Sequence, residues 1–343
     1  MKPKTPRLPK PPKVSKELEN TLYNEAYAFY HEAPWNTIHE EHIFAVQDPF
    51  SSSIGYCSIA GSGGECFGIA LFRGEESLNI HLQLQNGQNH PENAEIISSH
   101  NALVLDFLPK NMLNKKELAI LKRNPSAVPL DLFPSFLSYL PGFQGWHLTE
   151  EETSYFIFIL QSARKYAEEI ITPKPNPTKE KYTLYTRCQE TGLPQSSWHT
   201  PKPIASQPSE PIPLNTKRIE GLKGLKLYHD GAWEASTFNT PNLICDKERP
   251  YFAKVSMIVH QESLLVLQVK AIEVHECPKK HLSEEILSCI EIHKRIPAEI
   301  FFNNKALYEA LKPLAKTLGI QASLVDFLPA TAPAQDSLLQ YIR

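Results

Sequence analysis

The chain has 343 residues and a formal net charge of −3, with 35 Lys and Arg against 38 Asp and Glu. Because one hydrophobic core rarely organises more than about 250–300 residues, this length predicts two domains. The composition is 41% hydrophobic and 21% charged, which excludes disorder throughout, and the near-balanced charge excludes a chain-wide surface for nucleic acid or anionic membranes.

The start of the chain predicts a tail rather than a targeting segment. Residues 1–14 alternate basic residues with prolines, which fix φ and lack an N–H donor, so we expect this segment to be disordered. It has no apolar region of the secretory type, and no later run approaches the roughly 20 apolar residues that cross a bilayer. We therefore expect a cytoplasmic protein with no membrane partner, and the six thinly spread cysteines fit free thiols.

The next stretch predicts one helix followed by extended segments. Apolar residues recur at helical spacing over 16–32, which is typical of an amphipathic helix. Alternating or apolar runs separated by Gly and Ser clusters predict an antiparallel meander. Its expected strands are 43–47, 54–60, 66–72 continuing through 78–84, and 102–107.

The remainder of the N-terminal half mixes helices with irregular chain. Asn114 heads a short predicted helix, whereas the prolines in 124–145 predict an irregular stretch. Thr149 with Glu152 three residues later is a capping box, which predicts the start of a long helix. Segments at 182–187 and around Trp198 are expected to pair as a hairpin. Residues 15–203 thus read as an α+β domain.

A Pro-rich linker is predicted at 204–216, and residues 217–343 form the second predicted domain. Its expected elements are strands 233–238, 252–260 and 264–272, helix 283–294, strand 299–302, helix 304–318, strand 321–327 and a last helix from about Pro333. Three antiparallel strands followed by alternating helices and strands is the order of an RNase H-like α/β domain.

Several segments resemble a bacterial two-domain family in which both successive domains are of unknown function. They are Leu22-Tyr-Asn-Glu-Ala-Tyr, Ile54-Gly-Tyr-Cys-Ser, Gly63-Gly-Glu, Tyr139-Leu-Pro-Gly, Arg249-Pro-Tyr and Leu311-Lys-Pro-Leu-Ala. The resemblance covers both halves of the chain after the tail. It implies the domain organisation and carries no activity.

An RNase H-like nuclease or transposase needs carboxylates that hold two divalent metals on the first strand, after the fourth strand and on the last helix. The corresponding positions here are Glu234, Asn303 and Asp336. Asn303 offers a neutral oxygen where anionic charge is needed, so the site reads as defective. Mg²⁺ or Mn²⁺ is expected only if the chain is nevertheless a nucleic-acid-processing enzyme.

Two further clusters are weaker candidates for a site. Cys277, His281, Cys289 and His293 form two pairs with i, i+4 spacing, which suggests a zinc site, although packing is the commoner role. The aromatic residues Phe136, Tyr139, Phe143 and Trp146 flank a Pro-Gly turn and suggest a groove for a ligand or a protein partner.

Taken together, these features favour a non-catalytic intracellular interaction or regulatory protein with a degenerate RNase H-like domain and no resident cofactor. A protein partner is expected, because the net charge does not favour nucleic acid. Two alternatives stay open. They are a metal-dependent nuclease or transposase-like enzyme, and a small-ligand-binding module built on the aromatic residues.

Overall fold

The computed structural model describes residues 8–88, 99–123, 131–171, 181–202, 212–245 and 248–341. The chain divides into two compact units, one from Leu8 to Ile204 and one comprising the residues from Ala205 on. Residues 8–15 contain neither helix nor strand. Residues 1–7 of the predicted tail and 204–211 of the predicted linker lie outside the described residues.

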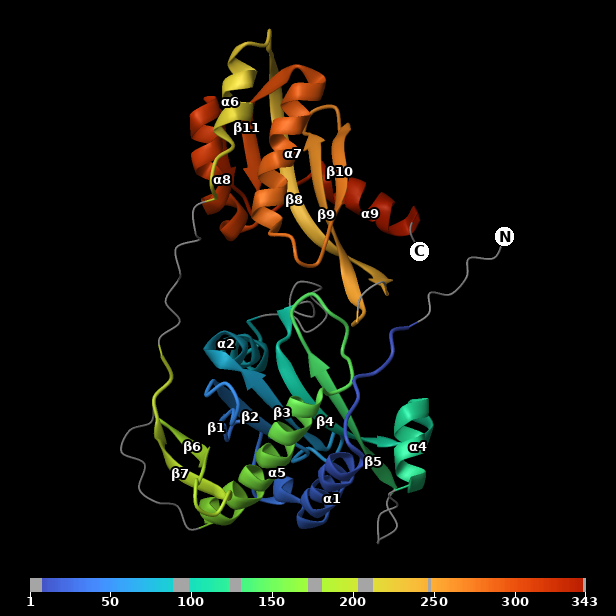
Figure 1. Cartoon of the computed structure of the whole chain (residues 1–343). Coiled ribbons are helices and arrows are strands. Elements are labelled where there is room, and N and C mark those ends of the chain that lie inside the picture. Colours follow the sequence, from blue (N-terminus) through green and yellow to red (C-terminus); the bar gives the residue numbers. More distant parts are fainter. Residues whose placement is uncertain are drawn as a thin grey trace, which may run out of the picture. The chain divides into compact units, whose positions relative to one another are not determined.

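The N-terminal domain is built on a seven-stranded sheet with the order β5-β4-β3-β2-β1-β6-β7 in the described part of the chain (Figure 1). Its strands are β1 (Phe44–Gln47), β2 (Ile54–Ala60), β3 (Gly68–Arg73), β4 (Ala102–Pro109), β5 (Leu132–Tyr139), β6 (Tyr182–Arg187) and β7 (Pro194–His199). Strands β1 to β5 pair antiparallel in sequence order, which confirms the predicted meander. The predicted hairpin β6–β7 joins this sheet through parallel pairing of β6 with β1.

Helices cover both faces of this sheet. Helices α1 (Lys16–Glu32) and α5 (Glu150–Ile171) lie side by side on one face, and α2 (Gly74–Gln85) covers part of the other (Figure 1). Single helical turns occur at η1 (Pro34–Asn36) and η2 (Lys110–Met112), and the short helix predicted after Asn114 is α4 (Lys115–Arg123). The large core lies under α1 and α5, where the fully buried rings include Phe29, Phe44, Phe156 and Phe158.

The predicted capping box at the start of α5 is confirmed. The Glu152 carboxylate accepts the Thr149 backbone N–H at 2.9 Å, and the Glu152 N–H donates to Thr149 Oγ1 at 3.2 Å. The same carboxylate accepts the Ser138 hydroxyl at 2.7 Å and pairs with Arg73. Glu152 therefore fixes the start of the helix and also ties it to β3 and β5.

Two predictions for this domain were wrong. Residues 78–84 belong to helix α2, because Gly74, with φ of +76°, turns the chain out of β3 and two glutamates then occupy the first helical turn. Part of the stretch expected to be irregular, 124–145, forms strand β5. Proline at position 134 is tolerated there because β5 is an edge strand that pairs with β4 on one side only.

The C-terminal domain has the strand order β10-β9-β8-β11-β12 in its described residues. The elements are α6 (Thr216–Lys223), β8 (Tyr228–Ile244), β9 (Tyr251–His260), β10 (Val266–Ile272), α7 (Pro278–His293), β11 (Arg295–Phe302), α8 (Lys305–Leu318), β12 (Gln321–Leu324) and α9 (Thr331–Tyr341). Strands β8, β9 and β10 are antiparallel, whereas β11 is parallel to both β8 and β12. This is the predicted RNase H-like topology.

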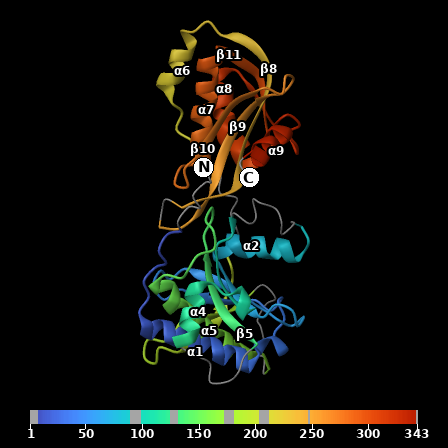
Figure 2. The same cartoon turned by 90° about the vertical axis from the view of Figure 1, so that its right-hand side faces the viewer.

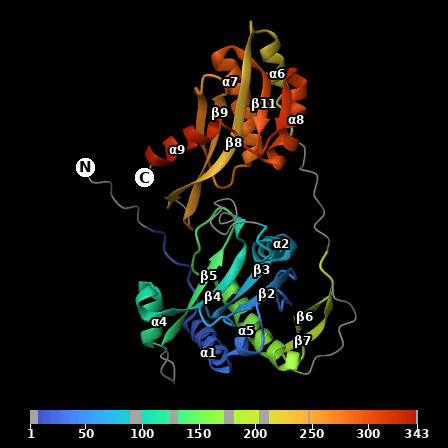
Figure 3. The same ribbon diagram turned by 180° about the vertical axis from the view of Figure 1, so that it is seen from behind.

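Strand β8 separates two packed layers. Side chains alternate along a strand, and Trp233 accordingly packs with α7 and α8 while Phe238 packs with α9. Figures 2 and 3 show α7 and α8 on one side of the sheet and α9 on the other. The central strand is thus buried on both faces.

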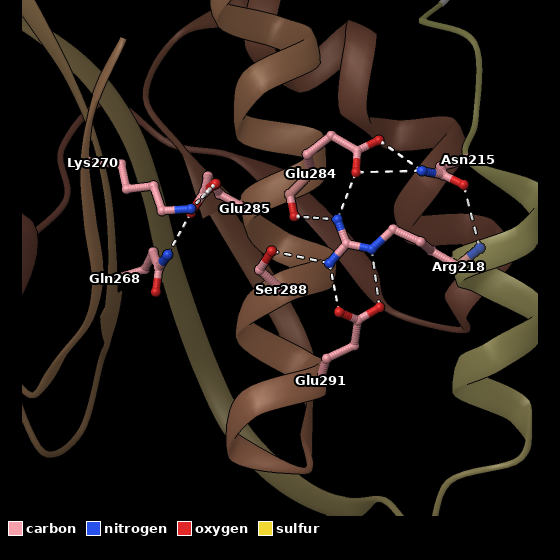
Figure 4. A network of polar contacts seen from close by, with 8 residues as sticks. All are labelled: Asn215, Arg218, Gln268, Lys270, Glu284, Glu285, Ser288 and Glu291. Carbon is pink, nitrogen blue, oxygen red and sulfur yellow. Dashed lines mark hydrogen bonds and ion pairs between the residues drawn. The ribbon is translucent and has the colours of Figure 1, made fainter.

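A polar network attaches the first helix of this domain to α7 (Figure 4). Arg218 donates to Glu291 through Nε and Nη2, at 3.0 and 2.6 Å, and to Glu284 through Nη1 at 2.6 Å. Asn215 caps α6 and also donates to Glu284. Figure 4 also shows Lys270 and Gln268 of β10 donating to the carboxylate of Glu285, which lies on the sheet-facing side of α7.

We expect Arg218→Ala to lower the free energy of unfolding of the C-terminal domain by about 1–2 kcal/mol, since the bidentate pair is only partly shielded from water. Arg218→Lys should recover less than half of the loss, because an ammonium cannot bridge two carboxylates as a planar guanidinium does. Urea unfolding would measure both changes. Exposed Lys223→Ala on the same helix is the control, and an Arg218→Lys variant as stable as the wild type would contradict the prediction.

Candidate functional site

Glu234, predicted to be the metal ligand on the first strand of the C-terminal domain, lies in β8. Glu234 lies opposite Val259 of β9 and Phe301 of β11, so it occupies the middle of the sheet. Its side chain points to the face covered by α9 and is fully buried. A carboxylate buried this deeply requires partners for its charge.

The partners of Glu234 are backbone N–H groups at the start of α9. Ala330 N–H donates to both carboxylate oxygens at 3.2 and 3.0 Å, and Thr331 N–H donates to Oε2 at 2.7 Å. The first N–H groups of a helix lack intrahelical acceptors, and the helix dipole makes this end positive. The chemistry that this arrangement supplies is therefore anchoring: Glu234 caps α9 and docks it on the sheet.

The other two predicted metal-site residues do not complete a site. Asn303 follows β11 and is exposed, and Asp336 is exposed on the second turn of α9. Within the described residues, no group of three or more His, Cys, Asp or Glu side chains could hold a metal ion.

The hypothesis of a four-ligand zinc site was wrong. Cys277 and His281 lie at the start of α7 and Cys289 and His293 at its end. A helix rises 1.5 Å per residue, so even His281 and Cys289, the nearest members of the two pairs, are about 12 Å apart along the helix, far beyond shared coordination. Cys277 is exposed, whereas Cys289 is buried and burial raises its pKa to about 12. His281 Nδ1 lies 3.2 Å from the Glu276 carboxylate, and His293 Nε2 lies 3.3 Å from the Leu267 carbonyl.

The aromatic residues predicted to line a groove are placed differently from one another. Phe136 of β5 is buried against Tyr23 and Phe156, with ring centroids 5.5 and 5.2 Å apart. Trp146 is buried where its backbone bridges to Ser138. Tyr139, the last residue of β5, and Phe143, in the turn that follows, are both half-buried. The stretch thus folds back on its own strand.

A hollow of about 400 Å³, open solvent included, lies beside Phe136 and is lined by both polar and apolar side chains. Its lining includes Glu19, Tyr23, Lys116, Glu117, Phe136 and His147. Burial, followed by the charge of Lys116, lowers the pKa of His147 to about 4, so the ring is neutral at pH 7. Burial also lowers the pKa of Lys116.

Glu117 is the residue of this hollow that the sequence reasoning missed. Its carboxylate accepts the Asn114 N–H at 2.7 Å and the Ser135 hydroxyl at 2.5 Å, while Asn114 Oδ1 accepts the Glu117 N–H at 3.0 Å. The Asn-x-x-Glu spacing is the signal that could have identified it as a capping pair. The carboxylate oxygens of Glu117 already accept hydrogen bonds from residues at the start of α4 and in β5, which indicates a structural role.

Comparison with known proteins identifies two successive domains. Residues 20–187 match the family described as "Domain of unknown function (DUF7309)", and residues 218–339 match "Domain of unknown function (DUF6930)". No curated protein matches the chain. No helix in the described residues is long and apolar enough to cross a membrane.

Among solved structures, the chain is similar to the catalytic core domain of BIV integrase. The identity is 16% and the TM-score 0.24, over 32% of this chain and 66% of that chain. This chain therefore spans just under two thirds of the length of that structure, and a likeness of this size carries no functional conclusion.

Proposed function

We propose that this tandem of two domains of unknown function is an intracellular interaction or regulatory protein, and that its RNase H-like domain binds a protein partner without cleaving nucleic acid. The observation that carries the proposal is the Glu234 carboxylate. It accepts backbone N–H groups of Ala330 and Thr331 beneath α9. A metal ion at this position would have to displace the first turn of α9.

The neighbouring positions support the same proposal. Asn303 supplies a neutral amide where the two-metal reaction needs an anion. The formal net charge of −3 gives nucleic acid no general attraction to the chain. A protein partner is the class that these features favour, because it requires neither metal nor excess positive charge.

The direct test is cleavage of labelled single-stranded DNA, duplex DNA and RNA by the purified full chain with Mn²⁺ or Mg²⁺. We expect no metal-dependent cleavage, and none in Asn303→Asp, because Glu234 stays committed to α9 in that variant. Metal-dependent cleavage that Asp336→Ala abolishes would refute the proposal. Asp336→Ala is suitable because Asp336 is exposed and makes no part of the Glu234 anchor.

A further inference from the structure

A second polar cluster lies at the end of the sheet where β8 begins. Asp230 lies near the start of β8, His260 ends β9, and Ser263 follows in the turn to β10. His260 Nε2 is 3.3 Å from Asp230 Oδ1, and His260 Nδ1 is 2.9 Å from Ser263 Oγ. The imidazole of His260 thus lies between a hydroxyl and a carboxylate, with one ring nitrogen in contact with each.

The tautomer of His260 follows from its neighbours. The Ser263 backbone N–H donates to His260 Nδ1 at 3.2 Å, and an amide N–H cannot accept. Nδ1 therefore carries no proton and is the acceptor for the Ser263 hydroxyl. The ring proton is on Nε2, facing Asp230. This is the tautomer that a general base next to a serine requires.

Asp230 is held as a carboxylate. Burial alone would raise its pKa, but hydrogen bonds from Trp233 Nε1 and Arg295 Nη1, both at 3.0 Å, outweigh burial, so the pKa of Asp230 lies below its usual value. The Asp230 and His260 side chains are 7% and 13% exposed. A carboxylate so placed orients the ring and stabilises an imidazolium.

Glycine at 231 keeps room for the histidine. A Cβ at this position would lie 3.3 Å from His260 Nε2 and 3.5 Å from the Glu262 carboxyl carbon. Next to Ser263, which is itself exposed, the side chains of Leu264, Leu265 and Val266 are 58%, 59% and 40% exposed. The serine therefore faces solvent beside an apolar surface.

We propose that Ser263 is a nucleophile, with His260 as its general base and Asp230 as the residue that orients the base, and that it accepts acyl groups from esters with apolar acyl chains. This inference goes beyond the proposed function and uses none of the residues around Glu234. It depends on the Oγ–Nδ1–Nε2–Oδ1 alignment and on the exposed apolar side chains.

Ser263 Oγ forms a bond to the ester carbonyl carbon as its proton passes to His260 Nδ1. The bond from that carbon to the leaving oxygen then breaks. His260 returns its proton to that oxygen, so that an alcohol departs; where the leaving group departs as a phenolate, His260 loses the proton to solvent and is again free to act as a base. Water next attacks the acyl-serine, losing a proton to His260, and the carboxylic acid is released as Ser263 regains its proton.

The test uses the full chain with two probes, p-nitrophenyl acetate and a fluorophosphonate, and locates the modified residue by mass spectrometry. We expect p-nitrophenolate release and fluorophosphonate labelling at Ser263, both absent in Ser263→Ala. That variant keeps the backbone N–H that bonds His260, so the turn is retained. His260→Gln should slow labelling about 100-fold, the usual size of a general-base contribution.

Ser51 provides a matched control. It is an exposed serine whose hydroxyl donates to a carboxylate, Asp48 Oδ2, at 2.7 Å. Ser51→Ala should label at the wild-type rate. Labelling of Ser263→Ala at the wild-type rate, or of His260→Gln without slowing, would overturn the proposal. Neither result bears on the nucleic-acid cleavage test, so the two proposals fail separately.

Discussion

Glu234→Ala is expected to lower the free energy of unfolding of the C-terminal domain by about 3 kcal/mol. The substitution removes three charge-assisted hydrogen bonds and leaves the N–H groups of Ala330 and Thr331 buried without an acceptor, each at a cost of about 1–3 kcal/mol. Hydrogen exchange at these two amides would report the loss locally, and urea unfolding would measure the total.

Two matched variants separate anchoring from metal binding. Glu234→Gln keeps one oxygen acceptor and should lose about half as much stability. Asp336→Ala, exposed on the same helix, should change the unfolding free energy by less than about 0.5 kcal/mol. Equal losses for Asp336→Ala and Glu234→Ala would contradict the anchoring role, as would unchanged exchange at Ala330 and Thr331 in Glu234→Ala.

The element order of the C-terminal domain could be predicted because its signals are local. Each strand is a separate apolar run, and α8 carries its own cap, Asn304, whose side chain accepts the Leu307 N–H at 3.0 Å. In the N-terminal domain the prediction was wrong at two points, because the sequence shows neither the position of a strand in the sheet nor the backbone angles of a glycine. Position 134 allows a strand only because β5 lies at a sheet edge, and Gly74 ends β3 only because its φ is positive.

The candidate sites also differ in whether the sequence alone could identify their roles. Asn303 could be identified as a neutral substitute from the order of the strands alone. The role of Glu234 could not, because its partners lie 96 and 97 residues further along the chain. Asp230 and His260 likewise meet only through the pairing of β8 with β9. The zinc hypothesis failed because i, i+4 spacing aligns one pair of ligands and leaves two pairs on one helix far apart.

The second large expected loss of stability concerns the aromatic stretch of the N-terminal domain. We expect Phe136→Ala to lower the free energy of unfolding of that domain by about 3–4 kcal/mol, because the substitution opens a cavity in a packed core. Phe136 is 7% exposed, and its ring makes edge-on contacts with Tyr23 and Phe156 across the interface of β5 with α1 and α5. Urea unfolding followed by tryptophan fluorescence would measure the change.

Phe143→Ala is the matched control, because Phe143 belongs to the same aromatic stretch but is only half-buried in a turn outside the strand. It should cost less than about 1.5 kcal/mol. The pair also tests the groove hypothesis. A groove residue would lose ligand or partner binding at unchanged stability, whereas a core residue loses stability first. A Phe136→Ala variant with wild-type stability would mean that β5 and α5 do not share the tightly packed core described for this domain.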